Sequence, residues 1–121
     1  MTRTHHDLLA WQQGISLVRS VYQLTRSFPP SELYALTNQM HRAAISIPAN
    51  IAEGMGRESK KELVHFLTMA RGSLSELDTY LVLAKELGYC TDAAEVQAIA
   101  DRAFALIGGL INSNRRSTRT A

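Results

Sequence analysis

The sequence of 121 residues has one cysteine, three prolines and few aromatic residues, which make up 7% of the chain. A single cysteine excludes an internal disulfide and favours a reducing compartment, with Cys90 as a packing residue rather than a nucleophile. No apolar run approaches the ~20 residues that span a bilayer, and the N-terminus lacks the apolar core of a signal peptide. We therefore expect a soluble cytoplasmic protein, and the length leaves room for one domain.

Acidic residues are missing from the last nine positions, which contain Arg115, Arg116 and Arg119. The other 112 residues carry 10 basic and 11 acidic groups, so the formal net charge of +2 comes from this end of the chain. We interpret residues 113–121 as a basic, flexible tail that aids solubility or contacts phosphate. Residues 1–6 are interpreted as a flexible N-terminus.

Apolar residues recur at intervals of three and four through four segments, which is typical of amphipathic helices. Pro29-Pro30, the glycines after Glu53 and Gly88 separate these segments, and no stretch alternates with the period of a strand. The pattern predicts helices over roughly 7–28, 32–53, 59–87 and 92–112. Short connections then favour an all-α, antiparallel up-and-down four-helix bundle. Pro48 predicts a kink or bend in the second helix.

Small residues stand on the side of the fourth segment that we expect to face outward, at Ala98, Ala105 and Gly109. Small side chains let another helix approach closely, and the first segment is also broadly apolar. This pattern favours a homo-oligomer, with a monomeric bundle as the alternative.

Polar residues also follow helical spacing beside the apolar face. Ser46, Asn50 and Glu53 align along one edge of the second helix, and Ser73 and Glu76 along an edge of the third. If these edges meet, they form a half-buried polar seam. We interpret it as a hydrogen-bonded network that sets the helix register, because buried polar groups are costly unless they are paired. A small-ligand or anion site is the alternative, and no paired nucleophile and base indicates catalysis.

Metal binding has only a partial signal. Glu62 and His65 match the Glu-x-x-His motif of di-metal four-helix bundles, but the sequence holds no second copy of it. We therefore expect neither a metal nor another cofactor.

A phosphate-binding signal lies after the second helix. The run Gly54-Met55-Gly56 matches neither the dinucleotide fingerprint nor the P-loop. It does place Arg57, Lys60 and Lys61 beside the start of the third helix, where free amides and the helix dipole favour an anion. These three residues are candidates for contact with nucleic-acid phosphate.

Five stretches between Asp7 and Tyr89 carry a family resemblance. They are Trp11, Phe28-Pro29 with Glu32, Leu36-Thr37-Asn38-Gln39-Met40, Ser46-Ile47-Pro48-Ala49-Asn50-Ile51-Ala52-Glu53-Gly54, and Ala70-Arg71-Gly72-Ser73 with Glu76-Leu77. With these stretches the sequence resembles a family of four-helix bundle proteins often called 23S rRNA intervening-sequence proteins. It departs from the family at His41, before Arg42, where a second basic residue such as arginine is common.

The resemblance implies a small cytosolic bundle without known catalysis that forms homo-oligomers, commonly pentamers. A related group looks like the accessory protein of diversity-generating retroelements, which contacts a reverse transcriptase and nucleic acid through a basic surface. We therefore expect a non-enzymatic scaffold or adaptor for RNA, DNA or a nucleic-acid-handling partner. Its candidate binding residues are Arg57, Lys60, Lys61, Arg115, Arg116 and Arg119. The alternative is a small-ligand- or metal-binding bundle that uses Glu53 and Glu76.

Overall fold

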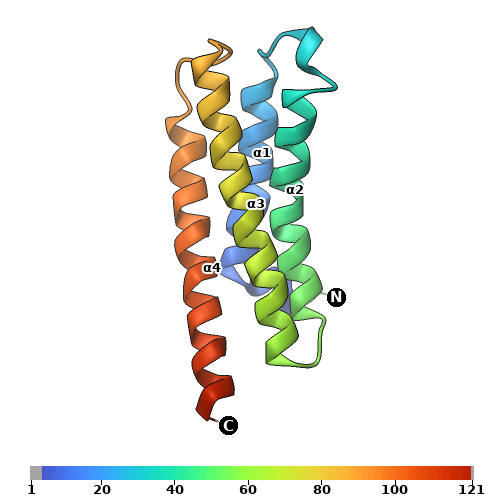
Figure 1. Cartoon of the computed structure of the whole chain (residues 1–121), viewed down its shortest axis with the longest axis vertical. Helices are drawn as coiled ribbons and strands as arrows, with labels where there is room; N and C mark the ends of the chain where they lie inside the picture. Colours follow the sequence, from blue (N-terminus) through green and yellow to red (C-terminus); the bar gives the residue numbers. More distant parts are fainter. Residues whose placement is uncertain (1–3, 121) are drawn as a thin grey trace.

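Four long helices, packed side by side in alternating directions, form the computed structural model of the chain (Figure 1). The structure describes the backbone of residues 4–120 and the side chains of residues 5–116. The helices are α1 (Leu9–Thr25), α2 (Leu36–Met55), α3 (Lys60–Glu86) and α4 (Ala94–Thr120), with short 3-10 helices η1 (Thr4–Asp7) and η2 (Pro30–Glu32). The predicted all-α antiparallel four-helix bundle is confirmed.

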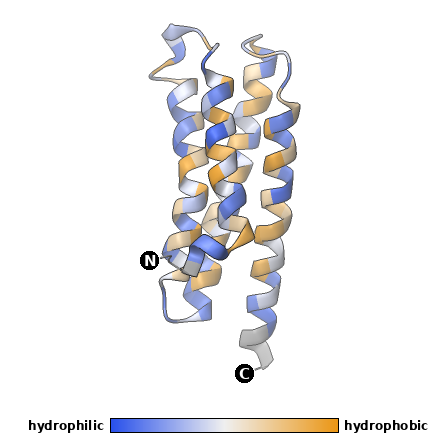
Figure 2. Cartoon of the chain, turned by 180° about the vertical axis from the view of Figure 1, so that it is seen from behind, coloured by the Kyte–Doolittle hydropathy of each residue, from blue (hydrophilic) through white to orange (hydrophobic). Residues whose placement is uncertain are grey.

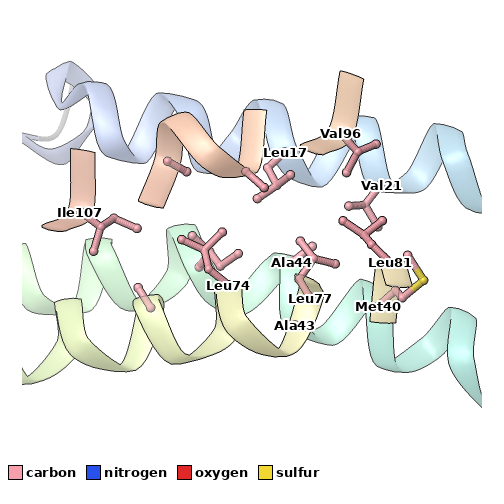
Figure 3. Close-up of a cluster of buried hydrophobic side chains, with 14 of the residues drawn as sticks. Leu17, Val21, Met40, Ala43, Ala44, Leu74, Leu77, Leu81, Val96 and Ile107 are labelled. Atoms are coloured by element: carbon pink, nitrogen blue, oxygen red, sulfur yellow. The ribbon is translucent and has the colours of Figure 1, made fainter. Parts of the chain in front are cut away.

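The hydrophobic core runs along the bundle axis and takes side chains from all four helices. Figure 3 shows these side chains pointing toward one another, and Figure 2 shows apolar and polar residues interleaved along each helix. Leu17, Met40, Ile47, Leu77 and Ile107 are among the fully buried residues. Each such side chain stabilises the fold by about 1.5–3 kcal/mol relative to an exposed position, so the apolar stripes hold the helices together.

The connection between α1 and α2 is longer than the sequence pattern predicts. α1 ends at Thr25 rather than near 28, and α2 begins at Leu36 rather than near 32. The prolines explain why α1 stops before Phe28, because the residue before a proline avoids the helical conformation. The later start of α2 follows from the 3-10 helix η2 and from the non-helical backbone of Ala35, with φ −120° and ψ −107°. Phe28 is still buried, and its ring packs against that of Tyr89 with 5.7 Å between the ring centroids. Glu32 accepts hydrogen bonds from the Tyr89 hydroxyl and from the Leu36 amide, which joins the two connections at this end of the bundle.

Pro48 lies inside α2, and the helix continues through it to Met55 without interruption. The proline ring is buried against α1. A Cβ atom built on Gly14 would lie 3.2 Å from the Pro48 Cβ, which is tighter than an ordinary contact, so the glycine helps α1 approach the ring closely. The sequence pattern identified Pro48, but not Gly14, the residue of α1 that packs against its ring.

α4 extends eight residues beyond its predicted end at 112. The segment predicted to be a tail, 113–121, is therefore helical through Thr120. Neither Gly108 nor Gly109 ends the helix, and no proline follows them. Ile111 is fully buried, and the Asn114 side chain donates to the Leu110 carbonyl, so the apolar face continues past the glycines.

Residues 4–7 of the predicted N-terminal segment form η1, which contacts α1 and α2. The rest of the predicted flexible N-terminus, residues 1–3, lies outside the described chain. Within the described residues, no helix is both long and apolar enough to cross a membrane.

Candidate functional site

Two serines form the centre of the predicted polar seam between α2 and α3. The Ser46 hydroxyl donates to Oγ of Ser73, and Ser73 donates to the Met69 carbonyl at 3.2 Å. The Ser46 Oγ also lies 3.1 Å from the Ala43 carbonyl. Ser73 is buried and Ser46 half-buried, so this pair, which we call the serine seam, meets as predicted and sets the register of the two helices.

The other three predicted members do not join the serine seam. Asn50 donates to the Ser46 carbonyl at 2.8 Å, which is a bond within α2. Glu53 is exposed and pairs with Arg57 at 2.6 Å, and Glu76 is exposed and accepts from the Tyr80 hydroxyl at 3.4 Å. The prediction that these two carboxylates share one seam is wrong.

The antiparallel packing of α2 and α3 explains this separation. Ser46 and Ser73 face each other, and from them Glu53 lies seven residues along α2 while Glu76 lies three residues along α3. Because the two helices run in opposite directions, these steps lead away from each other. At ~1.5 Å per residue the carboxylates are separated by about 15 Å along the axis. Periodicity aligned them on the correct edges but did not reveal the register between the two helices.

Two local interactions stabilise the α2–α3 connection: an N-terminal cap on α3 and the contacts of Arg57 with neighbouring side chains. Ser59 caps α3, because its hydroxyl oxygen accepts a hydrogen bond from the Glu62 amide at 3.1 Å. Arg57 lies over the Phe66 ring, 4.9 Å from its centroid, while its guanidinium binds Glu53. Lys60 and Lys61 occupy the exposed first turn of α3.

The last turns of α4 lie at the same end of the bundle as this connection (Figure 1). Arg115 and Arg116 are exposed there. The fold thus places at one end of the bundle two basic segments that are more than fifty residues apart in the sequence, and we call Arg57, Lys60, Lys61, Arg115 and Arg116 the basic end. Glu58 and Glu62 lie in the same region and offset part of its charge. The side chain of Arg119, the sixth predicted residue, lies outside those described.

Metal-ligating and nucleophilic groups are dispersed. Among the described residues, no three His, Cys, Asp or Glu side chains are placed to hold a metal ion. His5 and His6 lie against Trp11, with ring centroids 5.2 and 4.7 Å from it. Burial raises the pKa of the half-buried Cys90 thiol, which disfavours the thiolate that a nucleophile needs.

A polar pocket on the α2–α3 surface contains a residue that the sequence analysis did not select as a site. Its volume is about 290 Å³, and it is lined by Gln39, Arg42, Ala43, Ser46 and Glu76. We call it the Arg42 pocket. Glu76 enters it because the serine seam places this part of α3 opposite the Ala43 region of α2. The spacing of Gln39, Arg42 and Ser46 indicates that they share one face of a helix. It does not indicate that the Glu76 carboxylate of α3 lies opposite that face.

His41 marks a second feature that the residue pattern alone did not reveal. Its ring stacks on the Tyr22 ring, with 3.8 Å between the ring centroids, and its Nε2 atom lies 2.8 Å from Oγ1 of Thr25. Burial lowers the pKa of the His41 imidazole below its ordinary value of 6.5. The residue that departs from the family pattern therefore joins α2 to α1.

An apolar groove of about 420 Å³ lies between the start of α1 and the second half of α4. Leu9 lines it and is 53% exposed, and Gly109 and Ala105 form part of its α4 wall. Ala98, Phe104, Ala105 and Gly109 are all exposed, so the outward position predicted for the small residues of α4 is confirmed. We call Ala98, Ala105 and Gly109 the α4 outer face; Phe104 lies beside it, on the side of α4 that faces α3.

Comparison with known proteins agrees with this architecture and with the residues that build it. The family model described as 23S rRNA-intervening sequence protein matches residues 6–109, which include the serine seam, the Arg42 pocket and the α2–α3 part of the basic end. None of the curated proteins matches the sequence. Because the family model covers most of the chain and all four helices, the chain belongs to the 23S rRNA-intervening sequence protein family.

Proposed function

We propose that this protein is a non-enzymatic, homo-oligomeric bundle of the cytoplasm that binds nucleic acid through the basic end. It then serves as a scaffold for nucleic acid and for proteins that act on it. The supporting observation is the placement of Lys60, Lys61, Arg115 and Arg116 at one end of the bundle, although they come from distant parts of the chain.

The local electrostatics support phosphate as the contacted group. α3 begins at this end, so its first amides and its helix dipole add partial positive charge to that of the side chains. Arg57 contacts both the Glu53 carboxylate and the Phe66 ring, and these contacts orient its guanidinium. Since Glu58 and Glu62 reduce the net charge, one subunit alone would bind weakly. Several copies acting together would gain affinity through avidity.

The surface of α4 supports self-association. Phe104 is 49% exposed, and the neighbouring residues of the α4 outer face are small. Next to them lies the apolar groove against α1. An exposed apolar surface of this kind is typical of an interface, and family membership favours five subunits.

A salt titration of nucleic-acid affinity tests the binding proposal. The wild-type protein should bind a single-stranded oligonucleotide more weakly as salt rises, with a log–log slope of roughly −0.7 for each phosphate contacted. The slope should become markedly shallower in a variant that lacks four charges of the basic end: Lys60→Gln, Lys61→Gln, Arg115→Gln and Arg116→Gln.

A matched control variant removes four positive charges away from the basic end: Arg19→Gln, Arg26→Gln, Lys85→Gln and Arg102→Gln. Its slope should remain close to that of the wild-type protein, because these side chains lie elsewhere on the bundle. An equal loss in both variants, or a wild-type affinity that does not change with salt, would contradict the proposal.

Native mass tests the oligomer. The wild-type mass should be a multiple of the 13.4 kDa chain, with five copies as the expected number. Phe104→Glu should reduce it, because a charge beside the α4 outer face is costly to bury under a second subunit. Val82→Glu, on an exposed apolar position of α3, is the control and should leave the mass unchanged. A monomeric wild-type protein would rule out this part of the proposal.

The alternative of a small-molecule or metal-binding bundle has less support. Its two key carboxylates are separated, and Glu53 is already engaged by Arg57. Copurification of a metal or small molecule that is lost in a Glu53→Gln variant would restore it.

A further inference from the structure

The Arg42 pocket is a cleft between α2 and α3 that small side chains leave open. Ala43 and the Ser46 hydroxyl line it, and Ser46 is held against Ser73. The volume of the pocket is about 290 Å³, and Gln39, Arg42 and Glu76 complete its lining. This value lies near the lower limit of roughly 300–1,000 Å³ for ligand pockets, so the pocket suits a small ligand or one flat ring.

The pocket presents an unpaired positive group and an available negative group. Within the described side chains, Arg42 forms no hydrogen bond or ion pair, and its guanidinium stays more than 4.0 Å from the Glu76 carboxylate. Gln39, which lines the same pocket, likewise has no side-chain partner among them. Glu76 accepts only from Tyr80, at 3.4 Å, and this bond leaves most of its acceptor capacity unused.

These groups match the edges of one nucleic-acid base. Guanine has two adjacent acceptors, O6 and N7, which an arginine binds with a pair of parallel hydrogen bonds. Its N1–H and its exocyclic amine are adjacent donors, which a carboxylate accepts with its two oxygens. A pocket with a guanidinium and a carboxylate on facing helices therefore satisfies both edges, whereas adenine offers neither the O6 acceptor nor the N1–H donor.

We propose that the Arg42 pocket binds a single unpaired guanine, with Arg42 on O6 and N7 and Glu76 on N1–H and the exocyclic amine. Unpaired bases of single-stranded RNA are the bases that proteins recognise by such edges. The proposal deepens the proposed function and rests on it for the class of polymer. Arg42 stands fifteen residues before Arg57 on the same helical path, about 22 Å along the axis. A few nucleotides of one extended strand span that distance to the basic end.

Titration with free nucleosides tests the pocket without the basic end. Guanosine should bind more tightly than inosine, which lacks the exocyclic amine, and more tightly than 7-deazaguanosine, which lacks N7. Adenosine should bind weakest. Arg42→Gln and Glu76→Gln should each weaken guanosine binding roughly tenfold or more, because each removes one of the two paired contacts. Arg102→Gln, an exposed arginine on α4, is the matched control and should bind guanosine as the wild-type protein does.

Several results would overturn the proposal: no guanosine binding at millimolar concentration, equal binding of guanosine and adenosine, or unchanged affinity in both pocket variants. Saturation by a free amino acid in place of guanosine would also overturn it and would assign the two charges to a zwitterion. Circular dichroism of each variant shows whether the bundle remains folded.

A second pair of titrations separates this proposal from the proposed function. An oligouridine and the same strand with one guanosine should both show steep salt dependence, with tighter binding of the guanosine strand. If the two bind equally, the pocket proposal fails while the basic end stands. If free guanosine binds but neither strand does, the pocket stands and the basic end fails.

Discussion

Small residues occur both at the α2–α3 interface and on the outward side of α4, and the structure gives them different surroundings. A Cβ atom built on Gly54 in α2 would lie 3.0 Å from both Leu63 and Phe66 of α3. One built on Gly108 or Gly109 in α4 meets nothing within 4 Å. Gly54 permits close packing of α2 against α3 inside the subunit, whereas Gly108 and Gly109 leave the surface of α4 open to a partner.

Truncation of large side chains should separate the two regions most strongly. Ile51 is fully buried in α2. The substitution Ile51→Ala should lower the unfolding free energy of the protein by about 2–5 kcal/mol, because it leaves a cavity in the core. Leu9→Ala, at the rim of the α1–α4 groove, should have little effect on the isolated subunit. Urea denaturation measures both. A loss from Leu9→Ala as large as that from Ile51→Ala would mean that Leu9 is buried in an assembly.

The glycines provide the next comparison, with opposite signs expected. Gly54→Ala should destabilise the bundle by about 1–3 kcal/mol, because the added methyl group forces α2 and α3 apart. Gly109→Ala should stabilise the isolated subunit by about 0.5–1 kcal/mol, since alanine is the better helix former and the site is open. Thermal melts at equal protein concentration measure the signs. Destabilisation and a lower native mass in Gly109→Ala would instead place another subunit against this position.

The serine seam should contribute more than the exposed carboxylate predicted to share it. Ser73→Ala removes a buried hydroxyl and should cost about 1 kcal/mol. Glu53→Ala should cost at most about 0.5 kcal/mol, because its pair with Arg57 is an exposed pair within one helix. Denaturant midpoints of the two variants give the comparison. A larger loss for Glu53→Ala would show that its carboxylate contacts more than Arg57.

The smallest expected effect concerns the α1–α2 contact at His41. Because burial lowers its pKa in the folded state, the unfolded chain binds a proton more readily as the pH falls below the ordinary value of 6.5. The unfolding free energy should therefore decline as the pH drops below about 6.5. Above that pH, His41 should make no contribution to the pH dependence of stability. His41→Gln should flatten that part of the curve, and His65→Gln, at an exposed position, should not. Identical curves for the His41→Gln and wild-type proteins would contradict the assignment.

Much of the fold was predictable from periodicity. Helix number, order and direction followed from the apolar stripes and the breaks at Pro29-Pro30, Gly54–Gly56 and Gly88, because burial of one face drives each helix into the bundle. The ends were less predictable. α4 continues past Gly109 because Ile111 finds a buried position, and this depends on how far the neighbouring helices extend.

The candidate sites were predictable only as lists of residues on faces. Helical spacing placed Ser46 and Ser73 on the facing edges where they meet, and the charge pattern located basic residues at the start of the third helix and at the end of the chain. It did not show that Glu53 and Glu76 point to different levels, or that Arg42 shares a pocket with Glu76. Both depend on the register between two antiparallel helices, which no pattern within one helix contains.

Local chemistry therefore decides which segments of this chain are helical and which faces they bury, because hydrogen bonding and hydrophobic spacing act over a few neighbouring residues. The packing of distant segments decides the rest: the serine contact, the pocket beside it and the placement of the α2–α3 turn and the end of α4 at the same end of the bundle. These arrangements follow from how four helices fill one core, and that is a property of the whole chain.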